Sequence, residues 1–142
     1  MDLQNLVRQY HTAADDFARG DPEPVKQIFS HRDDVTLANP FGRAVRGWKH
    51  VSEALNFASA RFREGAVTSF QSIAEYIAPD LATILELEQW QAKVSGRQDL
   101  SSFELRVTST FRREDGTWKL IHRHADPIST AHPDGPLRSA NS

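Results

Sequence analysis

The sequence predicts a single domain of the α+β class, with three N-terminal helices packed in a curved, mostly antiparallel sheet. Apolar side chains recur every three or four residues as far as position 63, which is typical of helices with one buried face. From residue 66 onward the apolar period is two, the spacing of strands with one buried face. Helices followed by a run of strands are characteristic of the α+β class. A chain of 142 residues is long enough for one domain with a substantial core.

Three segments carry the helical period, namely residues 2–19, 23–30 and 48–63. Asp2 is placed to cap the first helix, because a carboxylate before the first turn accepts hydrogen bonds from unpaired backbone N–H groups. Gly65 is expected to stop the third helix, since glycine readily adopts the left-handed conformation found at helix C-termini.

The strands begin with a short segment at 35–38 and continue with four longer ones at 67–77, 81–94, 101–113 and 117–126. Asp115-Gly116 separates the last two strands, and this pair favours a tight hairpin because both residues reach positive φ. Residues 128–142 are rich in Ser, Pro, Gly and Asn, which predicts a flexible tail outside a domain that spans 1–127.

The predicted strand 81–94 is ambiguous, because apolar and polar side chains occur on both of its faces. We favour Leu85 and Leu87 on the inner face. Glu86 and Glu88 would then lie on the outer face and form cross-strand ion pairs. Their expected partners on neighbouring strands are Arg106 and Arg123.

The composition excludes several classes of function. A net charge of −2 gives no attraction to nucleic acid or to an anionic membrane. The absence of cysteine excludes disulfides, thiolate catalysis and cysteine-ligated zinc. No apolar run of about 18 residues occurs, and the N-terminus lacks the pattern of a signal peptide, so we expect a cytoplasmic protein. Because no phosphate-loop or dinucleotide motif occurs either, we expect no cofactor.

Two motifs carry a resemblance to a known family. An Asn-Pro-Phe-Gly arm at 39–42 precedes a helix that starts at Gly47-Trp48, and the last hairpin ends in Trp-Lys-Leu-Ile-His-Arg-His-Ala-Asp at 118–126. With the order of the elements, these motifs resemble the nuclear transport factor 2-like superfamily over about residues 3–127. The closest branch is that of the SnoaL-like and ketosteroid isomerase-related proteins, and the ending also resembles the association domain of calcium/calmodulin-dependent kinase.

This resemblance implies a cone-shaped α+β half-barrel with a pocket, commonly a homodimer through the outer face of the sheet. It does not imply one activity, because members isomerise, cyclise, dehydrate, hydrolyse epoxides or only bind. The steroid isomerases use a carboxylate base at the position of Asn39, and an amide does not accept a proton at neutral pH. Their oxyanion-holding tyrosine and aspartate fall near Ala13 and at Ser109, while Tyr10 lies one helical turn earlier. The steroid-isomerase mechanism is therefore not expected here.

The same resemblance places His122 and His124 of the last strand in the pocket. Their spacing puts both imidazoles on one side of the strand, about 6–7 Å apart. Histidine titrates near neutrality, so either ring suits a general acid or base. Asn39 is expected to polarise a substrate carbonyl, and Asp126 to orient His124. These residues predict a cofactor-independent isomerase, cyclase, dehydratase or hydrolase that acts on a small organic ligand.

Other interpretations remain open. In one, the pocket binds a small ligand without catalysing a reaction. In another, the domain is a dimerisation or assembly module. A metal held by His122, His124 and Asp126 is a weaker alternative, because a His-x-His pair alone is a poor metal signal. Arg43 and Arg46 are candidates to hold a ligand carboxylate. The expected ligand-binding residues besides the catalytic set are Tyr10, Phe41, Trp48, Phe103, Val107, Ser109 and Asp126.

Overall fold

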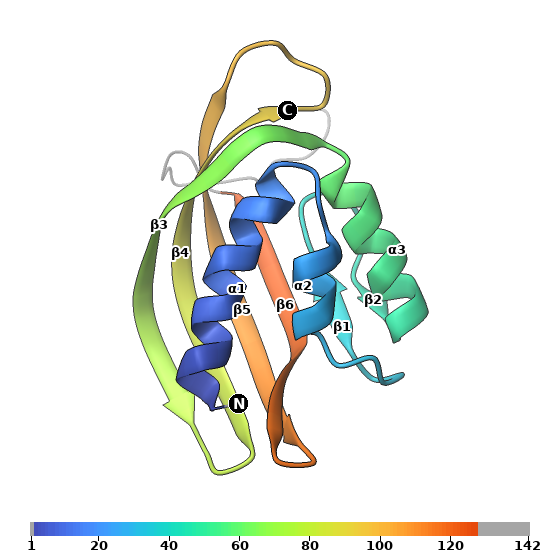
Figure 1. Cartoon of the computed structure of the whole chain (residues 1–142), viewed down its shortest axis with the longest axis vertical. Helices are drawn as coiled ribbons and strands as arrows, with labels where there is room; N and C mark the ends of the chain where they lie inside the picture. Colours follow the sequence, from blue (N-terminus) through green and yellow to red (C-terminus); the bar gives the residue numbers. More distant parts are fainter. Residues whose placement is uncertain (1, 128–142) are drawn as a thin grey trace, which may run out of the picture.

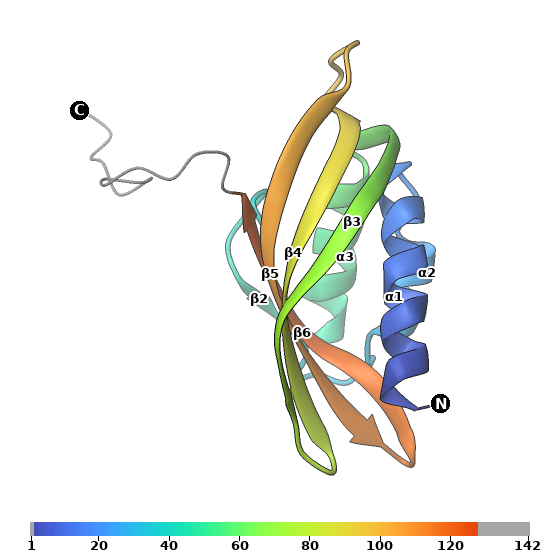
Figure 2. The same ribbon diagram turned by 90° about the vertical axis from the view of Figure 1, so that its left-hand side faces the viewer.

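A computed structural model describes residues 2–127 of the chain. Three helices lie against one face of a curved six-stranded sheet (Figures 1 and 2). The predicted tail at 128–142 lies outside the described residues. The elements in chain order are α1 (Leu3–Ala18), α2 (Glu23–Ile28), β1 (Thr36–Ala38), β2 (Val45–Arg46), α3 (Trp48–Ser59), β3 (Phe62–Ile77), β4 (Leu81–Val94), β5 (Ser101–Glu114) and β6 (Thr117–Pro127).

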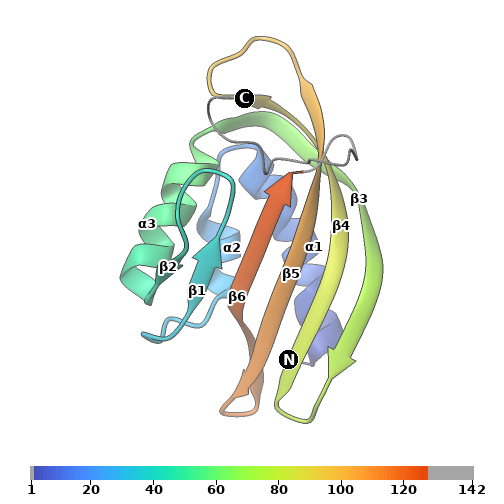
Figure 3. The ribbon, with the colours of Figure 1, turned by 180° about the vertical axis from the view of Figure 1, so that it is seen from behind.

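The strand order in the sheet is β2-β1-β6-β5-β4-β3. Every neighbouring pair is antiparallel except β1 and β6, which run parallel. The helices cover only the inner face, so the opposite face of the sheet is left without a helix (Figure 3). The predicted class, an α+β fold with a curved and mostly antiparallel sheet, is confirmed.

Local signals placed two of the element boundaries correctly. The Asp2 carboxylate accepts a hydrogen bond from the backbone N–H of Asn5 at 2.8 Å and caps α1. At the β5–β6 hairpin Asp115 and Gly116 both have positive φ, 52° and 82°. This is the backbone conformation that the favoured two-residue hairpin turn requires.

The end of the third helix was predicted wrongly. α3 ends at Ser59, and Phe62, expected on its apolar stripe, already belongs to β3. Gly65 lies inside β3 at a register irregularity, where a Cβ atom would come within 2.5 Å of the Ala92 Cβ and 2.7 Å of the Ala18 carbonyl oxygen. The glycine is therefore required by the close approach of α1 and β4 rather than by a helix terminus.

The inner face of β4 is the opposite of the one favoured from the sequence. Glu86 and Glu88 are buried on it, in the same alternating set as Ile84 and Trp90. Leu85 and Leu87 are only partly buried, on the outer face. Each glutamate has a polar partner inside, which makes its burial possible. These partners come from other elements, so the alternation of residues within β4 alone does not predict that the two glutamates are buried.

β6 contains a β-bulge that decides the orientation of its second half. Thr110 of β5 pairs with His122, whereas the next residue, Phe111, pairs with Leu120. Ile121 is the additional residue, and an additional residue shifts the alternation of faces by one. Before the bulge Leu120 points into the core; beyond it Arg123 points inward instead of the histidines on either side.

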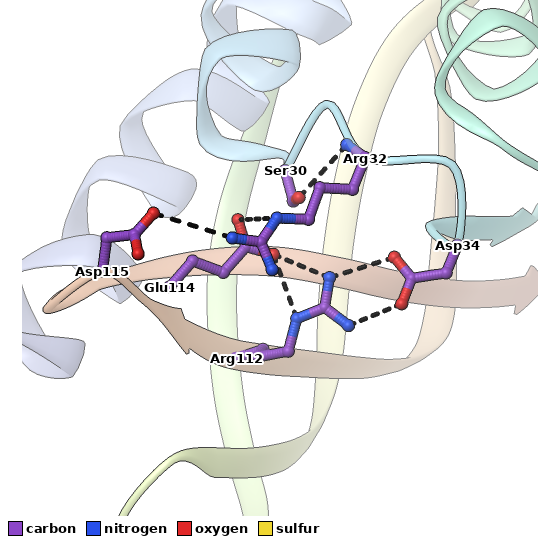
Figure 4. A network of polar contacts seen from close by, with 6 residues as sticks. All are labelled: Ser30, Arg32, Asp34, Arg112, Glu114 and Asp115. Carbon is purple, nitrogen blue, oxygen red and sulfur yellow. Dashed lines mark hydrogen bonds and ion pairs between the residues drawn. The ribbon is translucent and has the colours of Figure 1, made fainter.

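A polar cluster fastens the segment between α2 and β1 to the β5–β6 hairpin (Figure 4). Arg112 donates two hydrogen bonds to Asp34, at 2.6 and 3.0 Å, and two to Glu114. Arg32 adds longer ion pairs to Glu114 and Asp115. The hydrogen bond from Arg112 is the main cause that lowers the pKa of Asp34. This cluster positions β1, which pairs with the bulged half of β6.

Within residues 2–127 no helix has the length and apolar character needed to cross a membrane.

Candidate functional site

A largely apolar cavity of about 330 Å³ lies between the helices and the inner face of the sheet. Its volume is at the lower end of the range for small-molecule sites. Its walls are mostly carbon, with aromatic rings of β3, β4 and β5 packed on one another at centroid distances of 5.3–6.1 Å. The apolar lining consists of Ala14, Phe17, Val25, Leu37, Pro40, Phe41, Leu55, Ala58, Phe62, Trp90, Val94, Phe103, Leu105 and Pro127.

Two buried polar side chains from distant parts of the sequence meet at the cavity wall. Tyr10 comes from α1 and Arg123 from β6, and both line the cavity. The Arg123 Nε donates to the Tyr10 hydroxyl at 2.8 Å, and its Nη2 donates to the Glu88 carboxylate at 3.0 Å. Tyr10 in turn donates to the other oxygen of Glu88. The Trp90 indole N–H also donates to Glu88, at 2.9 Å. We call Tyr10, Glu88, Trp90 and Arg123 the buried polar cluster.

The buried polar cluster holds one cation and one anion. Glu88 is 0 % exposed, and the Arg123 side chain is 12 % exposed. Burial by itself lowers the pKa of Arg123, but the Tyr10 and Glu88 oxygens outweigh burial and keep that pKa above its ordinary value. Burial is the largest cause that raises the pKa of Tyr10 well above its usual range. At neutral pH the cluster therefore holds an arginine cation, a phenol and a carboxylate, with a net charge of zero.

Four of the predicted site residues lie around this cavity. Tyr10, Asn39, Phe41 and Phe103 are all part of its lining. The Asn39 side-chain oxygen accepts a hydrogen bond from the Phe41 N–H at 3.0 Å, which fixes the side chain at the start of the arm. The structure therefore brings these residues together; their part in ligand binding stays a prediction.

His122 and His124 do not lie at the cavity, so the predicted orientation is wrong. The β-bulge at Ile121 turns both side chains to the outer face of the sheet. There His122 Nδ1 and the Thr36 hydroxyl are 2.8 Å apart, and His124 is exposed. Burial, and secondarily the charge of His124, lowers the pKa of His122. The predicted acid–base role stays untested, but a ligand in this cavity would not reach either ring.

The remaining predicted residues also lie away from the cavity. Asp126 is on the outer face, where Arg106 donates two hydrogen bonds to it at 2.9 and 3.0 Å, so it does not orient His124. Trp48 stacks on His31 with ring centroids 3.9 Å apart. Val107 and Ser109 are buried on the inner face of β5 but are not part of the cavity lining.

Sequence reasoning missed Glu88, Trp90 and Arg123 as members of the site. The prediction did pair Glu88 with Arg123, but on the outer face. A glutamate within an alternating strand is usually a solvated residue, so its burial carries no signal of its own. The available clue was that Glu88, Arg123 and Tyr10 can satisfy one another's hydrogen bonds, since each of these residue types needs a polar partner when it is buried.

No three His, Asp or Glu side chains in the described part of the chain are grouped closely enough to hold a metal ion. His122, His124 and Asp126 share the outer face, where His122 pairs with Thr36 and Asp126 with Arg106.

A model of the SnoaL-like domain family matches residues 3–128, which is nearly the whole chain. The chain belongs to the SnoaL-like domain family. This agrees with the resemblance inferred from the Asn-Pro-Phe-Gly arm and the Trp-x-x-x-His-x-His ending. No curated protein sequence matches this SnoaL-like chain.

Solved structures confirm that the SnoaL-like chain has the nuclear transport factor 2-like fold. A superfamily protein from Salmonella enterica serovar Typhimurium is similar with a TM-score of 0.73 and 16 % identity, over 90 % of this chain and 89 % of that one. A ketosteroid isomerase-like protein from Erwinia carotovora has the same TM-score and identity, over 90 % and 95 %. A protein from Streptomyces avermitilis with a suspected dehydratase activity has a TM-score of 0.65 and 18 % identity, over 90 % and 94 %.

Proposed function

We propose that this SnoaL-like domain binds a small, largely apolar organic molecule in the cavity, with the polar end of that molecule at the buried polar cluster. The observation that carries the proposal is the position of Tyr10 and Arg123, two largely buried polar side chains in the wall of a mostly apolar cavity. The other polar residues of the lining are Asn39, Arg97 and Ser101. Apolar cavities with a few fixed polar groups are the usual form of small-molecule sites. The suspected dehydratase among the similar structures supports an organic ligand as well.

The proposal is tested with 2-decalone, a compact bicyclic ketone, and NMR of the indole N–H signals. Trp90 lines the cavity, so its signal is expected to move when the ketone binds. Ala58 also lines the cavity, and Ala58→Phe is expected to fill it and to abolish binding. Ala60→Phe is the matched control, because Ala60 is exposed two residues further along the chain. Absence of binding to the wild type, or unchanged binding to the Ala58→Phe variant, would contradict the proposal.

The enzymatic alternative is a cofactor-independent isomerase or lyase that uses the same cavity. A fixed phenol, carboxylate and guanidinium are groups that acid–base catalysis employs. Binding and catalysis are distinguished by incubating 2-decalone with the protein in deuterated buffer and measuring the deuterium content of the recovered ketone. Exchange of its α-hydrogens faster than with the Ala58→Phe variant would indicate catalysis, and recovery of unexchanged ketone would indicate binding only.

We also propose a homodimer through the outer face of the sheet. No helix covers this face (Figure 3), and it carries large exposed apolar side chains. Tyr76 is 67 % and Leu81 48 % exposed, and Leu85 and Leu87 continue the same face along β4. A contiguous exposed apolar face is typical of a protein–protein contact.

Sedimentation velocity tests the dimer. The wild type is expected to sediment with twice the mass of one chain, and Leu85→Arg to shift the protein to monomer, because a charge is placed within the contact. Leu100→Arg is the control, since Leu100 is an exposed leucine of the β4–β5 connection. A wild type that stays monomeric at the highest concentration would refute the dimer.

We expect the protein in the cytoplasm, and cell fractionation tests that compartment.

A further inference from the structure

We propose that the cavity selects uncharged ligands that present a hydrogen-bond acceptor, such as a ketone or ester carbonyl, and that Arg123 is the residue that determines this specificity. The inference rests on the proposed function, because it concerns the polar end of the same cavity. It goes further because it names the chemical class of the ligand and assigns the discrimination against charged ligands to Arg123.

The first step is that Arg123 has a donor to spare. A guanidinium carries five N–H groups. Among the described residues, Arg123 uses Nε toward Tyr10 and Nη2 toward Glu88, and its Nη1 has no partner. Nη1 is also accessible. In the described part of the chain, the Ser109 hydroxyl oxygen is the only buried side-chain polar atom without a partner, so Nη1, which has no partner either, is not fully buried. Since Arg123 lines the cavity, Nη1 is available to a molecule inside it.

The second step is that the acceptors of the cluster are out of reach. Glu88 is fully buried, and its two oxygens accept from Tyr10, Trp90 and Arg123. The Tyr10 hydroxyl hydrogen is committed to Glu88. Directly after β1, the neighbour of β6, the Asn39 oxygen accepts from the Phe41 N–H, which leaves the amide NH₂ as its free group. At the cluster and at Asn39 a ligand therefore meets donors, and an acceptor on the ligand is needed to pair with them.

The third step is the charge. The cation of Arg123 is already balanced by Glu88 at 3.0 Å, so the cluster as a whole is neutral. A carboxylate bound beside it would bring an unbalanced charge against an apolar wall, which is unfavourable. Arg97 is the other cation of the lining, but its side chain is 71 % exposed and lies 4.0 Å from Asp99, so it offers little compensation at the buried end. An ammonium group would be both unbalanced and opposed by donors. A neutral carbonyl satisfies the free N–H group without either penalty, and a hydrogen bond from a charged donor is among the stronger ones.

The test compares four ligands with one carbon skeleton. They are decalin, 2-decalone, decahydro-2-naphthoic acid and decahydro-2-naphthylamine, titrated at pH 7.5 and followed by the same indole signals. We expect 2-decalone to bind about tenfold tighter than decalin, since a charge-assisted hydrogen bond is added. The acid and the amine are expected to bind more weakly than decalin.

The role of Arg123 is tested with Arg123→Met, which keeps an apolar chain of similar length. It is expected to reduce the advantage of 2-decalone over decalin to less than about twofold, with decalin affinity retained. If this variant does not fold, Glu88→Gln/Arg123→Met serves instead, because it removes both charges together. Arg19→Met is the control, since Arg19 lies at the end of α1, away from the outer face and outside the cavity lining, in an exposed ion pair with Asp16.

The outcomes separate the inference from the function on which it rests. If none of the four ligands binds, decalin included, the proposed function fails. If decalin binds but 2-decalone has no advantage, or the acid binds tightest, the cavity binds ligands and the specificity inference is wrong. The inference is also wrong if the advantage of the ketone persists in the Arg123→Met variant.

Discussion

Replacing Arg123 with methionine is expected to lower the free energy of unfolding by about 3–5 kcal/mol, one of the largest losses that a single substitution in this chain can cause. The reason is not the ion pair itself but what remains after its removal. Glu88 is 0 % exposed and would keep its carboxylate in the core without a compensating cation. Removal of one partner of a buried pair is much more costly than replacement of both.

Urea denaturation at one fixed protein concentration measures this loss, because any dimer makes unfolding depend on concentration. Two comparisons sharpen it. Glu88→Gln/Arg123→Met is expected to be more stable than Arg123→Met alone, because it removes both charges of the buried pair together. Arg19→Met, which breaks an exposed pair with Asp16 on α1, is expected to cost less than about 1 kcal/mol. Equal losses for Arg123→Met and Arg19→Met would show that the Glu88 carboxylate is not confined to the core.

Gly65→Ala is expected to lower the free energy of unfolding by about 1–3 kcal/mol, although it adds one methyl group. The new Cβ would lie 2.5 Å from the Ala92 Cβ and 2.7 Å from two carbonyl oxygens, those of Ala18 and Gln91. None of these atoms belongs to a flexible side chain, so relief requires that α1 or β4 move. Because Phe62 of the same strand lines the cavity, the shift is also expected to weaken ligand binding.

The matched control is Gly42→Ala. A Cβ at Gly42 meets no atom within 4 Å, and its φ is not in the left-handed region. Its effect is expected to stay within about 0.5 kcal/mol, and a slight gain is possible because alanine reduces the freedom of the unfolded chain. Both variants are compared by thermal and urea denaturation. Equal stability of Gly65→Ala and Gly42→Ala would contradict the close packing of β3 against α1 and β4 at Gly65.

Local sequence signals were sufficient for most of the fold. The cap at Asp2 and the turn at Asp115-Gly116 depend on residues a few positions apart, and both were predicted correctly. Gly65 was misread because glycine ends helices and also permits close packing, and the sequence does not distinguish the two. Phe62 continued the helical period by coincidence, although the chain had already entered β3.

The candidate site was harder to predict, because it depends on contacts between distant residues. Burial of Glu88 becomes favourable only when Tyr10, 78 positions earlier, and Arg123, 35 positions later, reach the same point. No pattern within β4 reports those partners. The orientation of the histidines failed for a different reason, since strict alternation was assumed through a strand that contains a bulge. Asn39 and Phe41 were placed at the cavity correctly because the arm was recognised as a unit.

The additional residue at Ile121 also bears on how such a domain can diversify. Strict alternation from Leu120 with every residue kept would turn the guanidinium of Arg123 toward the outside and the two imidazoles toward the interior. The same stretch of β6 thus encodes two chemically different linings, one basic and always charged, the other titratable near neutrality. The bulge selects between them, so a shift by one residue in the pairing of β6 with β5 beyond Leu120 would exchange the lining without any replacement of a side chain.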